Sequence, residues 1–386
     1  MNADVIVVGA GVIGAAAAFH LAVAGAGDVL VLDRAAAGAG MSSRSSALIR
    51  MHYTFGPEVE LAVRSDAMFD AWPELTGRPS FVRRTGFARI VAPGEEDALR
   101  ANVAMQRALG ARAEIVSAAE LTGLAAGLRT DDIGCAAWEP HGGYGDGAVV
   151  AGDLLAAARE RGARYQPHTG ALALIRQGDR VTGVRTADGP LHAGTVILAA
   201  GVWSPALLAT AGISLPLETE LHRVAVLAHP PGGGATVACI DSVTGTYFRP
   251  EAGGQMTLAG TFTGPRGADP DTVPPTAQAG DLVPVVQAAA RRVPALADAG
   301  IARGVSGVYD MTPDARPLLG PLDGTDGLII AAGFSGMGFK IAPATGESLA
   351  GLVAGAAPGS VDITPFRPGR FAAGRPIEAP HPYSDD

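Results

Sequence analysis

Residues 4–14 read DVIVVGAGVIG, and residues 15–24 continue as AAAAFHLAVA. The run DVIVV is short and apolar, which is typical of a strand buried on both faces of a parallel sheet. A glycine-rich turn follows at once, and the next ten residues read as a helix rich in small side chains. A second apolar run, DVLVL at residues 28–32, ends at Asp33. This order of strand, glycine turn, helix, strand and acid predicts a dinucleotide-binding βαβ unit.

The glycines of the turn have separate tasks in such a unit. Gly9 permits the tight turn, Gly11 lets the backbone approach a pyrophosphate, and Gly14 lets the helix pack closely on the strand. The free N–H groups at the start of the helix, around Val12 and Ile13, then face the phosphates. The turn is therefore predicted to bind the pyrophosphate of a dinucleotide.

Asp33 narrows the choice of nucleotide. It lies 19 residues after Gly14, close to the spacing of about 20 expected of the acid that binds the ribose hydroxyls. A carboxylate at this position disfavours a 2′-phosphate, and so it disfavours NADP.

A second glycine-rich turn near the end of the chain decides between NAD and FAD. Residues 333–340 read GFSGMGFK and follow an apolar strand at 327–332. Their three glycines allow the backbone to pass close to a flat ring. The helix that begins near Phe339 aims its positive end at that ring, where an anionic reduced flavin would be stabilised. This turn favours FAD.

Composition and charge exclude several classes of protein. The chain has 386 residues, 48% of them hydrophobic, which is enough for two domains with large cores. A net charge of −9 without a basic stripe argues against nucleic acid, including an RNA-modifying role. Cys135 and Cys239 match neither a disulfide framework nor a metal site. We expect a cytoplasmic protein with no membrane segment, and the oligomeric state, a homo-oligomer included, stays open.

Pieces of two domains alternate along the chain. An amphipathic run at 57–75, a strand-like run at 86–91 and a charged helix at 95–109 read as an insertion, and strand-like runs dominate from 217 to 258. The tail from Pro365 is rich in proline and is expected to pack loosely. The predicted fold class is α/β, with a discontinuous Rossmann-like FAD-binding domain at 1–50, 140–215 and 300–370, an α+β substrate domain built on an antiparallel sheet at 51–139 and 216–299, and a tail at 371–386.

Four stretches together resemble a known family. These are the first glycine turn with Asp33, the run AAGVWS at 199–204, Tyr309 followed by TPD at 312–314, and GFSGMGFK at 333–340. They resemble the FAD-dependent family that includes D-amino-acid oxidase, glycine oxidase and, closest, monomeric sarcosine oxidase. The resemblance covers nearly the whole chain. It implies an FAD domain of the glutathione reductase type and an antiparallel sheet over the flavin.

The resemblance also implies roles for individual residues. Arg50 and Lys340 match the pair that binds the substrate carboxylate, and Tyr309 matches a tyrosine that lines the substrate pocket. A guanidinium with a nearby ammonium suits this task, because it forms paired hydrogen bonds and adds a point charge. The predicted cofactor-binding residues are Gly9, Gly11, Val12, Ile13, Gly14, Asp33, Arg34, Ser42, Ser43, Arg44, Ala200, Gly201, Trp203, Gly333, Gly336, Met337, Gly338, Phe339 and Lys340.

Three departures from sarcosine oxidase modify these expectations. Gly307 stands where that enzyme has the cysteine that binds flavin covalently, so we predict FAD that is not covalently bound. Leu258 is placed where the family has a lysine that promotes the reaction with oxygen, which puts oxidase activity in doubt, although Arg249 lies nearby. Met337 replaces a histidine, so the pocket should be more apolar and its substrate bulkier.

The predicted activity is oxidation of the C–N bond of an amino acid or N-alkyl amino acid to an imine, by hydride transfer to flavin N5. Oxygen or a separate acceptor then takes the electrons. Two alternatives are a flavin-dependent monooxygenase and a flavoprotein subunit of a larger amine dehydrogenase complex. The eight histidines form no pattern of metal ligands, and no metal is predicted.

Overall fold

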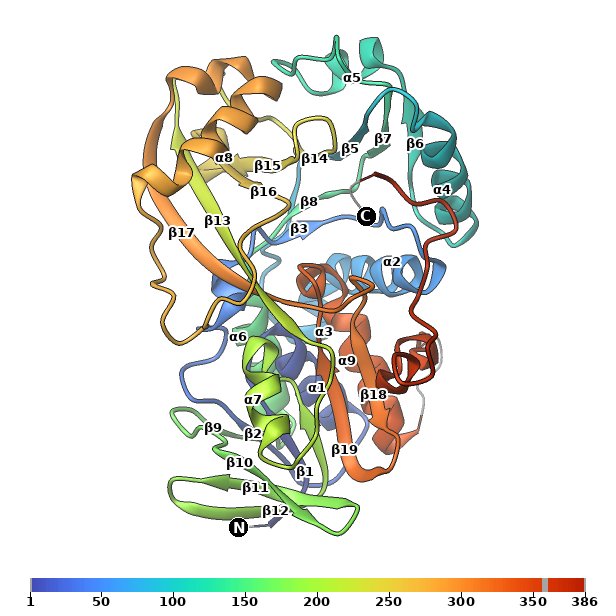
Figure 1. Cartoon of the computed structure of the whole chain (residues 1–386), viewed down its shortest axis with the longest axis vertical. Helices are drawn as coiled ribbons and strands as arrows, with labels where there is room; N and C mark the ends of the chain where they lie inside the picture. The colour runs from blue at the N-terminus through green and yellow to red at the C-terminus, as the bar shows by residue number, and fades with distance from the viewer. Residues whose placement is uncertain (1, 356–359, 385–386) are drawn as a thin grey trace.

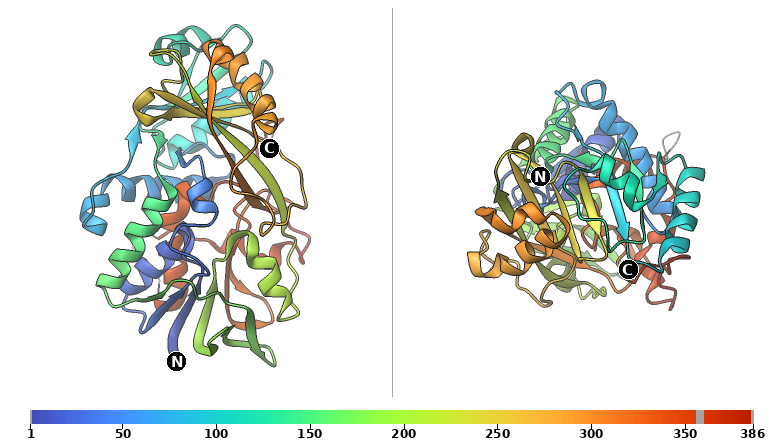
Figure 2. Two further views of the ribbon diagram at one scale, coloured as in Figure 1. Left: turned by 90° about the vertical axis from the view of Figure 1, so that its left-hand side faces the viewer. Right: turned by 90° about the horizontal axis from the view of Figure 1, so that it is seen from above.

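The molecule consists of two parts stacked along its long axis, each built around one large sheet (Figures 1 and 2). The computed structural model describes residues 2–355 and 360–384. The chain begins in the part drawn at the bottom of Figure 1, crosses repeatedly between the two parts, and ends against the upper one.

The lower part is built on an eight-stranded sheet whose central strands are parallel. Alternate residues of its inner strands point into two different cores, since Val5 and Val7 pack in one cluster and Ile6 and Val8 in another. This burial on both faces explains the apolar run at the start of the chain. In spatial order the strands are β10 (Ala173–Gln177), β11 (Arg180–Thr186), β19 (Thr325–Ala332), β12 (Gly189–Leu198), β1 (Asn2–Val8), β2 (Val29–Leu32) and β9 (Arg164–Gln166), with β18 (Leu318–Leu322) paired to β19.

Helices α1, α6 and α9 cover one face of this sheet. Their small residues let them pack closely. A Cβ atom added at Gly346 of α9 would lie 2.4 Å from the Ala16 backbone of α1, so these two helices approach almost to backbone contact. In the part of the chain that the structure describes, the α-helices are α1 (Val12–Val23), α2 (Gly56–Asp70), α3 (Trp72–Thr76), α4 (Glu96–Ala108), α5 (Ala118–Leu124), α6 (Gly147–Glu160), α7 (Ser204–Ala209), α8 (Ala279–Arg292) and α9 (Gly338–Ala354). The 3-10 turns are η1 (Met41–Arg44), η2 (Gly201–Trp203), η3 (Ala252–Gly254), η4 (Pro294–Asp298), η5 (Thr364–Phe366) and η6 (Pro368–Arg370).

The upper part is a second eight-stranded sheet, antiparallel except at β14–β5. Phe248 and Ala259 face an outer core that contains Leu282 of α8, whereas Tyr247 and Leu258 face inward, toward Leu48. In spatial order its strands are β17 (Gly300–Met311), β13 (Glu218–Ala228), β16 (Met256–Thr261), β15 (Thr246–Glu251), β14 (Ala238–Asp241), β5 (Phe87–Val91), β7 (Cys135–Glu139) and β6 (Glu114–Val116). A small sheet of β3 (Leu48–Ile49), β8 (Gly143–Tyr144) and β4 (Arg83–Arg84) joins the two parts.

The α/β class, the βαβ start and the antiparallel second sheet are confirmed. The predicted domain boundaries stay a prediction, and β17 pairs with the upper sheet although we assigned 300–370 to the lower part. The expectation of a loosely packed tail is wrong, because Phe366, Arg370 and Tyr383 are all buried. Residues 385 and 386 lie outside the described part of the chain. Within the described ranges, no helix has the length and apolar character needed to span a bilayer.

Candidate active site

Four of the segments singled out in the sequence follow the carboxyl ends of four neighbouring parallel strands. The sheet order places β19, β12, β1 and β2 side by side, and after them come the second glycine turn, the run AAGVWS, the first glycine turn and Asp33. Ligands of open α/β sheets bind outside the carboxyl ends of the strands. This edge is therefore the candidate cofactor site.

The first glycine turn fits the pyrophosphate of a dinucleotide. Gly9 has a φ of +106°, and a Cβ atom there would lie 2.3 Å from the carbonyl oxygen of Ala199. A Cβ at Gly14 would lie 1.9 Å from the carbonyl oxygen of Gly9. Helix α1 has Gly11 as N-cap and no side-chain hydrogen bond from that cap, so its first turn, apart from the N–H of Val12 that donates to Ser42, can face an anion. These residues fit the phosphates of FAD.

Asp33 and Ser42 hold this turn in shape. The carboxylate of Asp33 accepts hydrogen bonds from the backbone N–H groups of Ala10 (2.7 Å) and Ala35 (2.8 Å). The hydroxyl oxygen of Ser42 accepts one from the N–H of Val12 (3.1 Å). Both predicted residues therefore lie at the cradle, where Asp33 fixes the turn through both of its carboxylate oxygens. Its role at the ribose stays a prediction.

Arg34 and Trp203 meet beyond Asp33. The Arg34 guanidinium lies 4.8 Å from the Trp203 ring centroid, and both side chains bind Asp271, at 2.7 and 2.9 Å. Asp271 belongs to the segment between β16 and α8. This segment of the upper part therefore contacts the lower part beside the candidate cofactor site. No sequence signal marked this residue.

The second glycine turn is attached to the end of β17. The side-chain carboxylate of Asp310 accepts a hydrogen bond from the N–H of Gly333 (2.6 Å). The backbone carbonyl of Asp310 accepts a second one from the N–H of Ser335 (3.0 Å). Burial raises the pKa of Asp310 to about 6. Gly336 has a φ of +83°, and its Cβ would lie 2.6 Å from the Tyr309 ring, so glycine is required there.

The side chains of three predicted cofactor residues are engaged with other parts of the protein. Phe339 turns into the core and stacks on Phe69, with centroids 5.8 Å apart. The hydroxyl of Ser43 donates to the carbonyl of Gly40 at 3.0 Å. Arg44 lies against β17, its Cβ being 3.6 Å from where a Cβ of Gly307 would stand.

Arg50 and Lys340 come together as two neighbouring basic side chains. Arg50 Nη1 donates to the carbonyl of His52, its guanidinium lies 4.3 Å from the Tyr53 ring centroid, and its Nε has no hydrogen-bond partner among the described residues. Lys340 is the only lysine in the sequence and is 7% exposed, with Nζ 3.3 Å from the carbonyl oxygen of Gly336. Burial, and then the Arg50 charge, lower the pKa of Lys340 well below its usual range. Two carboxyl groups act on this pair electrostatically, Glu58 on Lys340 and Glu139 on Arg50.

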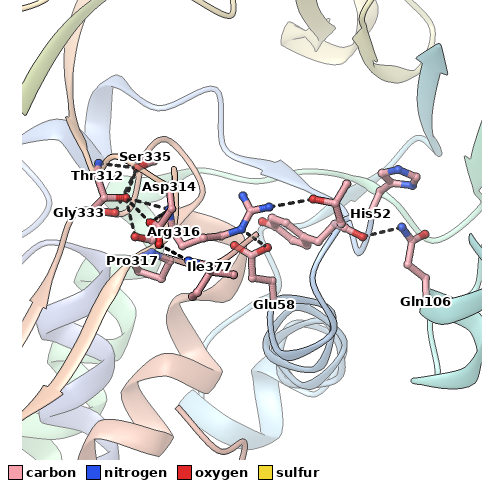
Figure 3. Close-up of polar contacts among 12 residues, drawn as sticks. His52, Glu58, Gln106, Thr312, Asp314, Arg316, Pro317, Gly333, Ser335 and Ile377 are labelled. Carbon is pink, nitrogen blue, oxygen red and sulfur yellow. Dashed lines mark hydrogen bonds and ion pairs between the residues drawn. The ribbon is translucent and has the colours of Figure 1, made fainter. Parts of the chain in front are cut away.

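Glu58, whose charge acts on Lys340, already has an ion-pair partner. Glu58 of α2 is fully buried and lies 3.1 Å from Nε of Arg316, whose Nη2 donates to the hydroxyl of Thr54 at 2.8 Å. Figure 3 shows Arg316 reaching from the turn that holds Thr312 toward Glu58. Because Glu58 is ion-paired with Arg316, its charge is shared between Arg316 and Lys340, and the Arg50–Lys340 pair is a candidate site for a ligand carboxylate.

Tyr309 lies in a polar cluster with His222, Glu220 and Tyr247, which the sequence analysis did not predict. His222 of β13 stacks on its ring, with centroids 3.8 Å apart and planes at 22°, and Nε2 of His222 lies 3.0 Å from Glu220. Tyr247 hydrogen-bonds to Tyr309. Burial raises the pKa of both tyrosines, so they are neutral phenols at neutral pH. The i, i+2 spacing of Glu220 and His222 on one strand face was the available signal.

Leu258 lies on the same inward face, buried among apolar side chains with Tyr247 and Leu48. Its cross-strand neighbour Arg249 is engaged with Glu251 (2.6 Å) and with the carbonyl of Ser46 (2.6 Å). Arg249 is therefore not an uncompensated cation over the site. Met337 is also buried, as the N-cap of α9.

Comparison with known proteins agrees with this geometry. The family described as DAO, FAD dependent oxidoreductase, matches residues 4–352. A 4-methylaminobutanoate oxidase (formaldehyde-forming) of Paenarthrobacter nicotinovorans is 29% identical over 94% of this chain, which spans only 45% of that protein. Glycine oxidase of Geobacillus kaustophilus is 30% identical, with 91% of this chain and 92% of that protein covered.

A solved structure extends the likeness to three dimensions. The crystal structure of L-proline dehydrogenase from P. horikoshii superposes with a TM-score of 0.87 at 26% identity, covering 97% of this chain and 99% of that one. The family match spans both glycine turns, and the cradle fits the phosphates of FAD. The chain therefore belongs to the FAD dependent oxidoreductase family and is an FAD-dependent enzyme.

Proposed function

We propose that this enzyme oxidises the C–N bond of an amino acid or N-alkyl amino acid to an imine, with the substrate carboxylate bound between Arg50 and Lys340. The observation that carries the proposal is a pair of adjacent basic side chains: a half-buried Arg50, whose Nε has no hydrogen-bond partner among the described residues, and a buried Lys340, whose pKa is lowered. A buried charge is costly unless it is paired, and a carboxylate supplies that pair with bidentate geometry.

The relatives support the same substrate class. Their printed names refer to glycine, proline and 4-methylaminobutanoate, all of which carry an amine and a carboxylate. FAD, when bound, supplies the acceptor for a hydride from the carbon next to nitrogen. Gly307 has no thiol, and Cys135 and Cys239 are buried in other strands of the upper sheet, so we propose non-covalent FAD. Acid precipitation should then release all of the flavin into the supernatant.

The residues of this chain bind and orient the substrate. Arg50 and Lys340 fix the carboxylate, and thereby the direction in which the reacting carbon points. Tyr309 and Tyr247, as neutral phenols, offer hydrogen bonds without acting as bases. Met337 and Leu258 contribute apolar surface that keeps water from the reacting carbon.

We propose further that a separate acceptor, rather than oxygen, is the efficient electron acceptor. The support is the absence of an uncompensated cation at Leu258 and at its neighbour Arg249, among the described residues of this strand pair. A developing superoxide charge would find no positive partner there. Homo-oligomer formation is left to measurement.

An absorbance titration of the purified holoprotein under anaerobic conditions tests the proposal. The panel contains D-amino acids, L-amino acids, N-methyl amino acids and 4-methylaminobutanoate, with NADPH as the control donor. We expect at least one amino or N-alkyl amino acid to bleach the flavin band, and slow recovery in air. Bleaching by NADPH alone would instead identify a monooxygenase, and recovery within seconds would identify an oxidase.

A further inference from the structure

Residues 376–384, here called the strap, run from the lower part of the molecule to the upper part. In Figure 1 they form the end of the dark red chain that climbs along α2 and α4. The N–H of Ile377 donates to Asp314 (2.9 Å) at the start of the strap, and the N–H of Ser384 donates to Glu95 (2.7 Å) at its end. Between them, Asn102 of α4 donates to the carbonyl of His381 at 2.8 Å. The strap is thus fixed along its length.

Tyr383 is the strap residue that reaches toward the site. Its side chain is 5% exposed and packs in an apolar cluster with Leu99 and Val103 of α4. Its hydroxyl lies 2.9 Å from Nε2 of His52, and the two rings are nearly parallel, at 22°. Burial lowers the pKa of His52 well below its usual range, so this contact is a hydrogen bond between neutral groups.

His52 connects Tyr383 to Arg50. The ring of His52 binds the strap, while its backbone carbonyl accepts the hydrogen bond from Arg50 Nη1. Tyr383, His52 and Arg50 therefore form one continuous chain of contacts. Through it, a residue more than 330 positions away in the sequence acts on the guanidinium that we assign to the substrate carboxylate.

The segment that follows Arg50 depends on such contacts for its position. Residues 51–54 belong to no helix or strand. Instead, each of them is bound by the side chain of a residue from a different place in the fold. The contacts are Met51 N–H to Glu139 (2.8 Å), His52 to Tyr383 (2.9 Å), the Tyr53 carbonyl to Gln106 (2.9 Å) and the Thr54 hydroxyl to Arg316 (2.8 Å). His52 and Gln106 are seen at the right of Figure 3.

We propose that Tyr383 is a positioning residue, which holds His52 and through it fixes Arg50 for binding of the substrate carboxylate. The proposal rests on the proposed function, because it assigns the carboxylate to Arg50. Without the hydroxyl of Tyr383, Nε2 of His52 is left buried without this partner, and the segment gains freedom to move. The guanidinium is then less well oriented before the ligand arrives, and binding of the carboxylate must order it.

The test compares Tyr383→Phe with wild type in the holoenzyme. Phenylalanine keeps the ring in its apolar cluster and removes only the hydrogen bond. We expect Kd for a simple carboxylate ligand such as acetate, followed by perturbation of the flavin spectrum, to rise about three- to tenfold. KM for a substrate should rise to the same extent while kcat at saturation stays within about twofold. Tyr383→Ala, which also removes the ring, should raise Kd further.

Tyr165→Phe is the matched control. Tyr165 belongs to β9 of the lower sheet, and its hydroxyl donates to the carbonyl of Ala35 at 3.4 Å, not to residues 51–54. This variant should leave Kd and KM unchanged. Unchanged Kd and KM in both Tyr383→Phe and Tyr383→Ala, or an equal change in Tyr165→Phe, would overturn the proposal.

A second measurement separates this proposal from the function on which it rests. Hydrogen–deuterium exchange of the peptide that spans residues 50–55 needs no substrate. We expect it to be faster in Tyr383→Phe than in wild type, with the peptides of the glycine turns unchanged. Unchanged exchange would show that the strap does not hold the segment. Faster exchange in an enzyme that binds no carboxylate would instead refute the role of Arg50.

Discussion

The ring of Tyr309 lies against His222 on one face, with centroids 3.8 Å apart, and its edge touches the backbone of Gly336. These contacts join β17, β13 and the second glycine turn at one point. The position of Tyr309 therefore depends on Gly336, which the sequence analysis predicted only as a cofactor-binding residue.

Gly336→Ala should disturb the contact between the second glycine turn and Tyr309. The added methyl group would lie 2.6 Å from the Tyr309 ring, at a residue whose φ is +83°. Either the turn or Tyr309 must move, and we expect kcat/KM to fall at least tenfold with a loss of stability of about 1–3 kcal/mol. Steady-state kinetics and thermal unfolding check this, with Gly245→Ala as the control, since it has a similar φ of +68° but no neighbour within 4 Å. Equal effects of the two variants would contradict the account.

Lys340→Met should weaken carboxylate binding specifically. The substitution keeps the side-chain length and removes the charge beside Arg50, so we expect Kd for carboxylates to rise at least tenfold. The affinity for FAD should change little. Spectral titration measures the carboxylate Kd, and flavin fluorescence measures the affinity for FAD. An unchanged carboxylate Kd would show that Lys340 does not bind the carboxylate.

The single lysine allows a chemical test as well. Because the pKa of Lys340 is lowered, its amine should react with a small acylating reagent near neutral pH. A bound carboxylate restores the charged form and covers the amine, so modification should slow in its presence. Peptide mass spectrometry measures the extent, and labelling that carboxylates leave unaffected would place Lys340 outside the site.

The phosphate cradle gives a prediction about cofactor retention. Gly14→Ala places a Cβ 1.9 Å from the carbonyl of Gly9, so helix α1 must shift away from the turn. We expect protein that purifies with little FAD and unfolds at lower temperature. Gly123→Ala, at a helical glycine with open space around it, is the control and should keep its flavin. Full flavin content in Gly14→Ala would be inconsistent with the cradle.

Glu139 predicts a pH dependence of stability. Burial raises the pKa of Glu139 from 4.5 to about 8, while its Oε2 accepts a hydrogen bond from the N–H of Met51. The folded state thus binds the proton more tightly than the unfolded state. The resulting stability is complete below about pH 4.5 and is lost as the pH rises toward 8, at up to about 1.4 kcal/mol per pH unit.

Glu139→Gln removes this titration but keeps an oxygen for Met51. Its free energy of unfolding, relative to wild type, should therefore rise between pH 5 and pH 8 and level off above. Urea unfolding at a series of pH values measures the difference. A difference that does not vary with pH would show that Glu139 titrates normally.

The parts of the fold that sequence reasoning predicted are local patterns with a strict physical cause. The turn between β1 and α1 needs glycine at Gly9 and Gly14, because a Cβ at either would collide with backbone. In the turn after β19, a Cβ at Gly333 or Gly336 would instead collide with side chains, those of Thr312 and Tyr309. Such patterns are visible in a few consecutive residues, and they locate the cofactor edge.

The parts that it missed join residues far apart in the chain. Asp271 meets Arg34 across 237 positions, and Tyr383 meets His52 across 331. The sequence around Asp271 does not indicate that it binds Arg34, and the sequence around Tyr383 does not indicate that it binds His52. The tail was expected to be loose from its proline content, but burial of Phe366 and Tyr383 depends on the surface against which the tail packs.

The central claim is that Arg50 and Lys340 bind the carboxylate of an amine substrate. The most direct measurement is the anaerobic rate of flavin bleaching by an N-alkyl amino acid and by the matched amine without the carboxylate, in wild type and in Lys340→Met. We predict that wild type strongly prefers the carboxylate-bearing substrate and that the variant loses most of this preference. Equal rates with both substrates in wild type would contradict the account.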